Sequence, residues 1–302
     1  MRVFVTGATG FIGSATVREL IDAGHEVVGL ARSDEAAAAL TDAGAEAHRG
    51  SLEDLESLRS GAAVADGVIH TAYIHDFSQM ENAAQTDLRA VETMGAVLEG
   101  SGRPLVVTAG TALVGPGTVV TEEDWPDRSA AVHPRFATAV TARALADRGV
   151  RSSIVRPGAS VHGEGDHGFV PYLIEVAREK GVSGYIGDGS NRWPAVHRLD
   201  TGHLYRLALE KAPAGSVLHA VADEGVPTRD IAEVIGRHLD VPVVSISRQD
   251  AQEHFGWMAM FWSLDVPASS ALTQERMGWT PTHLGLIADL DLGHYFRQPV
   301  AA

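Results

Sequence analysis

Three glycines near the start of the chain, Gly7, Gly10 and Gly13, have the spacing of a turn that binds a pyrophosphate. An apolar run precedes them at residues 3–5, and residues 14–21 follow with helical periodicity. The first glycine allows a sharp bend, the second lets phosphates approach, and the third lets the helix pack closely. The helix start then offers unpaired N–H groups to the anion. We therefore predict a dinucleotide-binding turn, rather than an ordinary glycine turn, made by Gly7, Thr9, Gly10, Phe11, Ile12 and Gly13.

The end of the second expected strand bears on which dinucleotide binds. A carboxylate at this place holds the adenosine ribose of NAD(H), whereas an arginine accommodates the 2′-phosphate of NADP(H). Here Ala31 is neutral, Arg32 offers a guanidinium, and Ser33 adds a hydroxyl group. These residues favour NADP(H) and leave NAD(H) open, and the alternative is that Arg32 is only a solvated surface residue.

The glycine turn needs a sheet behind it, and the first 160 residues have the pattern that a sheet requires. Apolar runs alternate with helical stretches, as in an α/β fold with a doubly wound parallel sheet. We expect strands at residues 2–5, 26–30, 45–49, 67–70, 104–108 and 152–156, and helices at residues 35–43, 52–63, 85–99 and 136–148. Right-handed crossovers would place the carboxyl ends of these strands at one edge, together with the glycine turn.

After residue 160 the chain changes character. Loops rich in glycine, proline and tryptophan are interrupted by short helices, expected at residues 172–180, 201–210, 228–239 and 250–255. We therefore predict a Rossmann domain over residues 1–160, with a strand and helix contributed from about 190–222, and a smaller substrate-binding lobe mainly over residues 161–302.

The composition excludes several classes of protein. The 302 residues carry a formal net charge of −15 without a basic tract, which argues against nucleic-acid partners and anionic membrane surfaces. There is no cysteine, so thiolate metal sites and cysteine nucleophiles are excluded. No apolar stretch reaches the length of a membrane span, and the chain starts directly on a core strand. We expect a cytoplasmic protein that acts on a small molecule.

The chain resembles the extended short-chain dehydrogenase/reductases, the NAD-dependent epimerase/dehydratase family, over nearly its whole length. Five landmarks of that family occur in order: residues 6–13, residues 70–72, residues 106–115, Val155-Arg156-Pro157 followed by residues 161–163, and residues 193–200.

The resemblance implies a Rossmann-type domain that holds NAD(P), with the diphosphate over residues 7–13. It implies that Ser51 and Leu52 flank the adenine, and that the nicotinamide and its ribose lie near Thr71, Ala72, Thr108 and Pro157. A homodimer through the helices at about residues 85–99 and 136–148 is expected on the same ground.

The chain departs from the family at its acid–base pair, a tyrosine followed four residues later by a lysine. None of the five tyrosines has a lysine at that distance, and His133 occupies the tyrosine position. This resembles a subgroup in which basic residues replace the pair. An imidazole with a pKa of about 6.5 can exchange protons near neutral pH without a lysine. The alternative is that His133 is a surface residue ahead of a helix that Pro134 begins.

Two further residues are candidates for the chemistry. The Thr111 hydroxyl is predicted to hold the substrate oxygen, unless it only satisfies a turn after the strand. Tyr73 follows residues 70–72 and is our second candidate for the proton donor. His162 and His167, on the loop after residue 161, are predicted to contact the substrate, unless they only hold the loop. An apolar, aromatic pocket is predicted to contact it as well, although half of its residues could instead be core: Phe169, Trp193, Trp257 and Phe261. The histidine spacings do not suggest a metal site.

Together these features predict an NADP(H)-dependent oxidoreductase that reduces a carbonyl of a small, moderately apolar substrate or oxidises the alcohol. One alternative is an epimerase or dehydratase that uses the cofactor transiently. Another is a dinucleotide-binding sensor without catalysis, which the missing Tyr–Lys pair makes reasonable.

Overall fold

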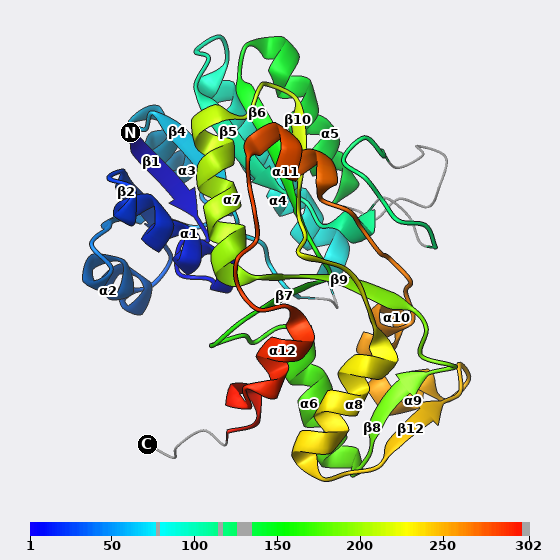
Figure 1. Cartoon of the computed structure of the whole chain (residues 1–302). Helices are drawn as coiled ribbons and strands as arrows, with labels where there is room; N and C mark the ends of the chain where they lie inside the picture. The colour runs from blue at the N-terminus through cyan, green and yellow to red at the C-terminus, as the bar shows by residue number, and fades with distance from the viewer. Residues whose placement is uncertain (77–78, 114–116, 126–134, 298–302) are drawn as a thin grey trace.

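A seven-stranded parallel sheet forms the centre of the first half of the chain (Figure 1). The computed structural model describes residues 1–76, 79–113, 117–125 and 135–297. The strand order is β10-β6-β5-β4-β1-β2-β3. The strands are β1 (Arg2–Thr6), β2 (Glu26–Ala31), β3 (Glu46–Arg49), β4 (Gly67–His70), β5 (Pro104–Thr108), β6 (Arg151–Pro157) and β10 (Ser216–Ala220). This is the doubly wound α/β fold that the sequence predicted.

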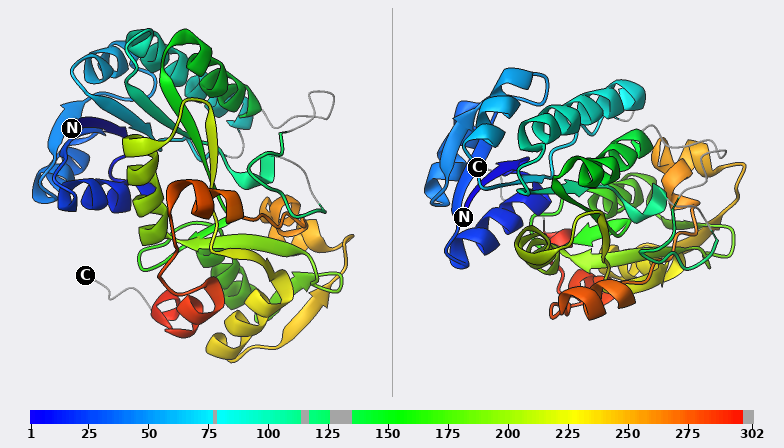
Figure 2. Two further views of the ribbon diagram at one scale, coloured as in Figure 1. Left: turned by 45° about the horizontal axis from the view of Figure 1, so that its top comes forward. Right: turned by 90° about the horizontal axis from the view of Figure 1, so that it is seen from above.

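Helices cover both faces of this sheet (Figure 2). Val3 and Val5 on β1 pack toward one face, whereas Phe4 packs toward the other, because successive side chains of a strand point to opposite sides. The first face carries α1 (Phe11–Asp22), α2 (Asp34–Asp42) and α7 (Arg198–Lys211). The second carries α3 (Leu55–Ala63), α4 (Met80–Leu98) and α5 (Phe136–Ala144), which continues as the short 3-10 helix η3 (Leu145–Arg148).

Most of the chain after β6 lies beyond the carboxyl edge of the sheet (Figure 1). The exceptions are β10 in the sheet itself, α7 on one of its faces, and α11 (Ala271–Met277), which packs against both. The part beyond the edge contains a three-stranded sheet of β7 (Ser160–His162), β9 (Arg192–His197) and β11 (Asp223–Pro227), and a pair formed by β8 (Ser183–Ile186) and β12 (Val243–Ile246). The helices of this part are α6 (Phe169–Lys180), α8 (Thr228–Leu239), α9 (Ala251–Phe255), α10 (Met258–Trp262) and α12 (Leu286–Asp291). Two 3-10 helices complete the described elements, η2 (Thr111–Leu113) and η4 (His294–Phe296).

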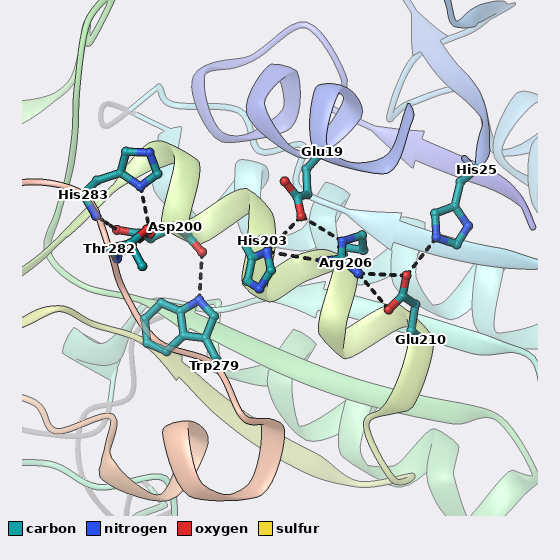
Figure 3. A network of polar contacts seen from close by, with 9 residues as sticks. All are labelled: Glu19, His25, Asp200, His203, Arg206, Glu210, Trp279, Thr282 and His283. Atoms are coloured by element: carbon teal, nitrogen blue, oxygen red, sulfur yellow. Dashed lines mark hydrogen bonds and ion pairs between the residues drawn. The ribbon is translucent and has the colours of Figure 1, made fainter. Parts of the chain in front are cut away.

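The helix α7 returns from the second half and lies against α1, held by the polar contacts drawn in Figure 3. Glu19 on α1 accepts a hydrogen bond from Arg206 Nε, and its Oε1 lies 2.8 Å from His203 Nδ1. Arg206 also donates to Glu210, and Glu210 Oε1 lies 3.0 Å from His25 Nε2. These contacts fix α7 along its length relative to the glycine turn.

The start of α7 is tied to a late segment of the chain. The Asp200 carboxylate accepts hydrogen bonds from the backbone N–H groups of Thr282 and His283, and the indole of Trp279 donates to the Asp200 carbonyl. Because α7 belongs to the sheet of the first half and residues 279–283 lead into α12, these bonds join the two halves.

The expected elements of the first half are confirmed, with two shifted helix starts. The helix expected from residue 85 begins at Met80, and the one expected from residue 52 begins at Leu55, because Asp54 caps it by accepting from Ser57 N. In the second half, a strand was expected only within about residues 190–222, where β9 and β10 lie, and the other short strands were not predicted. No helix in the described part of the chain is long and apolar enough to cross a membrane.

Candidate functional site

The glycine turn forms a cradle from which side chains are excluded. Gly7 has a φ of +68°, and a Cβ on it would lie 2.6 Å from the backbone nitrogen of Ala72. A Cβ on Gly13 would overlap the carbonyl of Gly7. Gly10 is the N-cap residue of α1 and offers no side-chain cap, so the first N–H groups of the helix are left for a ligand or solvent. The turn therefore fits the diphosphate of a dinucleotide.

The remaining turn residues flank this cradle. Thr9 and Gly10 are exposed, and Phe11 and Ile12 are partly buried at the start of α1. In contrast to α1, the next two helices close their own ends, since Ser33 Oγ accepts from Ala36 N and Asp54 accepts from Ser57 N. Of these three helices, α1 alone has no capping side chain.

The predicted adenosine-side residues lie at the ends of β2 and β3. Arg32 is exposed, and no hydrogen bond or ion pair joins it to another residue that the structure describes. Ser33 uses an oxygen lone pair to cap α2, which leaves its O–H free to donate. Ser51 accepts from Glu53 N and Asp54 N, both at 3.3 Å. Leu52 is partly buried in the core below α3.

The residues predicted at the ends of β4 and β5 differ in their exposure. Thr71 donates to the Thr6 carbonyl at 2.8 Å and remains partly exposed beside Ala72. Thr108 is buried, and its hydroxyl lies 2.8 Å from the His70 carbonyl oxygen and 2.6 Å from the hydroxyl of Tyr205. Both contacts of the Thr108 hydroxyl therefore lie inside the core, and a contact between Thr108 and the cofactor stays a prediction.

Pro157 is buried as the last residue of β6. It has neither a polar side chain nor a backbone N–H, so any contact with a cofactor would be apolar or through its carbonyl.

A buried chain of polar groups runs behind the ends of β1 and β4. The imidazole of His70 lies 2.7 Å from Thr6 Oγ1 through Nδ1 and 3.1 Å from Asp87 Oδ1 through Nε2. Arg135 Nε donates to the other oxygen of Asp87 at 3.4 Å. Burial alone would raise the pKa of Asp87, but the Arg135 guanidinium and the His70 hydrogen bond hold this pKa below its usual value. Asp87 therefore anchors Arg135 as a carboxylate.

The same guanidinium covers Tyr73. Its central carbon lies 4.0 Å from the centroid of the half-buried Tyr73 ring, which also contacts the His75 ring at 5.2 Å. Burial raises the pKa of the Tyr73 phenol, and the charge of Arg135 opposes that rise. At neutral pH the phenol is protonated, and it has a cation beside it that would stabilise a phenolate.

The other two catalytic candidates differ in what the structure describes. Thr111 is buried in η2, and its hydroxyl has no hydrogen-bond partner among the residues that the structure describes. An unpaired buried hydroxyl is costly, and such groups are often reserved for a ligand. His133 lies outside the described residues, as do Val114 and Gly115 at the end of the third landmark.

The loop after β7 brings a predicted substrate residue to the cradle. His167 is exposed, and its ring lies 5.8 Å from that of Phe11 in an edge-to-face arrangement. Asp166 holds the loop, since its carboxylate accepts from Gly168 N at 2.7 Å and from the Tyr295 hydroxyl at 3.0 Å. His167 therefore lies beside the start of α1, as a ligand-contacting residue could.

Two predicted substrate residues are core residues instead. The His162 side chain is fully buried, and its Nδ1 lies 2.8 Å from Asp289 Oδ2. Trp193 is 1% exposed and packs edge-to-face against Trp262, with ring centroids 4.9 Å apart. Neither side chain presents a surface to a substrate in this structure, so both predictions are wrong.

The other three aromatic candidates form a cluster that reaches the surface. The Phe169 ring lies 5.3 Å from that of Phe261 and 6.0 Å from that of Trp257, which is 38% exposed. Tyr172 contacts Trp257 at 4.8 Å and extends the cluster. Because Phe169 follows His167 by two residues, the cluster begins next to the loop at the cradle.

Sequence reasoning missed three side chains of this site. From the sequence, Arg135 is only a basic neighbour of His133, and Arg198 only a basic residue where related enzymes bind the diphosphate of a nucleotide sugar. Asp87 has no assigned role. A polar residue within an apolar helix face could have revealed Asp87, but its partner Arg135 is 48 residues away. Among the described residues, no group of three or more histidine and acidic side chains could hold a metal ion.

Comparisons with known proteins agree with this architecture. Residues 3–220 match the NAD dependent epimerase/dehydratase family. An uncharacterised protein of Schizosaccharomyces pombe is 53% identical over 98% of this chain and 100% of its own length. The 4-hydroxy-2-methyl-3-oxo-4-farnesyl-3,4-dihydroquinoline-1-oxide ketoreductase of Stigmatella aurantiaca is 27% identical over 89% of this chain and 84% of its own.

A solved structure has the same fold. It is the dTDP-glucose 4,6-dehydratase DesIV of Streptomyces venezuelae with NAD bound, which superposes with a TM-score of 0.77 at 20% identity and covers 96% of each chain. At this identity the likeness concerns the fold alone.

Proposed function

Because this chain belongs to the NAD dependent epimerase/dehydratase family, we propose that it is an NADP(H)-dependent oxidoreductase. It reduces a carbonyl group of a small, moderately apolar substrate, or oxidises the corresponding alcohol. The observation that carries the proposal is the protonated Tyr73 phenol under the Arg135 guanidinium, beside the backbone of Ala72 that closes the glycine cradle.

The chemistry follows from these groups. Bound NADPH would supply a hydride to the carbonyl carbon. Tyr73 donates its phenolic proton to the carbonyl oxygen, and Thr111 donates a hydrogen bond to the same oxygen. Arg135 then stabilises the Tyr73 phenolate until the phenolate takes a proton from water. Asp87 keeps the guanidinium in place. NADPH, the carbonyl compound and a proton thus give NADP⁺ and the alcohol.

The preference for NADP(H) rests on the end of β2. Ala31 brings no carboxylate against a 2′-phosphate, and the exposed Arg32 has no described partner to neutralise it. The hydroxyl of Ser33 can add a donor to the same phosphate. NAD(H) would leave these donors unused.

The apolar character of the substrate rests on the second half. The cluster of Phe169, Trp257 and Phe261 offers partly exposed aromatic surface. Arg192 is held by Asp265 through two parallel hydrogen bonds, both of 2.9 Å. Its charge is therefore already neutralised, which disfavours a nucleotide sugar whose diphosphate would need a cation.

Expectations from the sequence about location and partners accompany this proposal. The protein is expected in the cytoplasm, and as a homodimer that uses α4 and α5. A small-molecule substrate is its expected partner, without nucleic acid or membrane.

The test is to incubate the protein with NADPH and a panel of aldehydes and ketones. The loss of the near-ultraviolet absorbance of NADPH measures its oxidation. We expect oxidation of NADPH in step with the alcohol formed, and a kcat roughly 10²- to 10⁴-fold lower in the Tyr73→Phe variant. His133→Ala is the matched variant and should keep most of the activity. If His133→Ala loses turnover and Tyr73→Phe does not, the proton belongs to His133.

Two other outcomes would overturn the proposal. Conversion of substrate without net oxidation of NADPH would indicate an epimerase or dehydratase. Binding of NADPH without conversion of any compound would indicate a sensor.

A further inference from the structure

The start of α7 places a cation beside the glycine cradle. Arg198 is the first residue of α7, and its guanidinium carbon lies 5.0 Å from the ring centroid of Phe11, the first residue of α1. The two helices stay in the same register along their length, since Gly202 of α7 packs on Ala15 of α1, and Arg206 of α7 donates a hydrogen bond to Glu19 of α1. Both sets of partners advance by four residues, so α1 and α7 run parallel and begin at the same end.

The position of Arg198 is fixed by packing on both sides. A Cβ on Gly202 would lie 3.0 Å from the backbone of Ala15, so the glycine allows α7 to approach α1 closely. Across the loop after β7, a Cβ on Gly163 would lie 3.1 Å from Cγ of Arg198. Glycine at these two positions therefore leaves room for α7 and for the arginine side chain.

The charge of Arg198 is not neutralised by its neighbours. Its Nη1 donates to the Glu164 carbonyl at 2.9 Å, and in the described ranges of the chain no carboxylate pairs with it. Arg229 makes a useful contrast, because its guanidinium lies 5.5 Å from the Tyr185 ring but its Nε is paired with Glu233 at 3.0 Å. Arg198 thus has donors and charge to spare.

The cradle itself lacks such a charge. Residues 6–13 contain no basic side chain, and the protein carries a net charge of −15. The start of α1 supplies only about half a positive charge, whereas a diphosphate carries two negative charges. We propose that Arg198 binds the diphosphate of the dinucleotide from the side opposite to the glycine turn. This rests on the proposed cofactor, but not on the reaction.

The test is calorimetric binding of NADPH and of NADH to wild-type protein and variants. Arg198→Met should weaken both dinucleotides about equally, by roughly 10- to 100-fold, because both contain the diphosphate. Arg32→Met should weaken NADPH alone, because only NADPH has the 2′-phosphate. Arg229→Met is the matched control, since it removes a similar cation–aromatic pair away from the cradle, and it should change neither affinity.

Arg198→Gln is a second variant that keeps a donor for the Glu164 carbonyl, and it should show the same loss. Unchanged affinity for both dinucleotides in both Arg198 variants, or a loss confined to NADPH, would overturn the assignment of Arg198 alone. If wild-type protein binds neither dinucleotide, both the proposed cofactor and the assignment of Arg198 are wrong. If both dinucleotides bind and the Arg198 variants weaken them as expected, but no carbonyl compound is reduced, the assignment of Arg198 is supported and the proposed reaction is not.

Discussion

The proposed cofactor side of this site is formed by backbone groups, and the proposed substrate side by side chains. The cradle consists of backbone groups within residues 6–13, closed by the backbone of Ala72. The substrate side consists of side chains from α6 and α10, and from the loops next to them. The first is a local conformation that glycines make possible, whereas the second depends on which large side chains become buried.

This difference explains which residue predictions failed. The turn needs only neighbouring residues, so its place was apparent from spacing. His162 and Trp193 are of the same residue types as His167 and Trp257, but their partners Asp289 and Trp262 take them into the core. Residue type therefore indicates a ligand contact only when the tertiary partners are known.

The largest effect should separate two of the tryptophans of the second half, Trp193 and Trp257. Trp193→Ala should lower the free energy of unfolding by about 3–5 kcal/mol, because it empties a fully buried site. Trp257→Ala should cost about 1 kcal/mol, since 38% of that residue is already exposed. Denaturant unfolding followed by circular dichroism measures both. Equal losses would mean that the exposed cluster is core and not a substrate surface.

The next effect concerns the cradle. Gly13→Ala places a Cβ on the Gly7 carbonyl, and the turn must move apart, so affinity for NADPH should fall roughly 10- to 100-fold. Gly110→Ala is the control, because a Cβ there meets no atom within 4 Å. Calorimetric titration of both variants with NADPH makes the comparison. Equal affinities in the two variants would show that the close approach of Gly13 to Gly7 does not shape the site.

The smallest effect concerns pH at the junction of the two halves. Burial, with the neighbouring His162 and His283, lowers the pKa of His197 to about 4. The unfolded chain has a histidine pKa of about 6.5, so between these values the unfolded state binds more protons and stability falls as the pH falls. The contribution of His197 is on the order of 1 kcal/mol, allowing for solvent screening at a half-buried group.

The variant His197→Asn keeps a side-chain acceptor for Leu199 N at the start of α7 and removes the titration. Its stability should fall less than that of wild-type protein between about pH 6.5 and pH 4. Part of the fall should remain, because burial lowers the pKa of His219 to about 4 as well. Identical pH profiles for the two proteins would contradict this account of His197. Thermal unfolding at a series of pH values measures the difference.

The fold of the first half was largely predictable because its elements are long or strongly apolar. Strands such as β4 and β5 were expected at their observed bounds, and the crossover rule then fixed their shared edge. The strands β7 and β8 were missed, since runs of three or four residues among glycines and prolines show no clear alternation. Their pairing depends on contacts distant in sequence.

The sequence by itself determined the parallel sheet, the glycine turn and the neutral, arginine-bearing end of β2. Each of these depends on residues within a few positions of one another, where backbone geometry and side-chain type suffice. Only the tertiary structure decided that Arg135 covers Tyr73, that Arg198 reaches the start of α1, and that His162 is buried. Tyr73 and Arg135 are 62 positions apart in the sequence, Phe11 and Arg198 are 187 apart, and His162 and its partner Asp289 are 127 apart. No local pattern encodes such pairs.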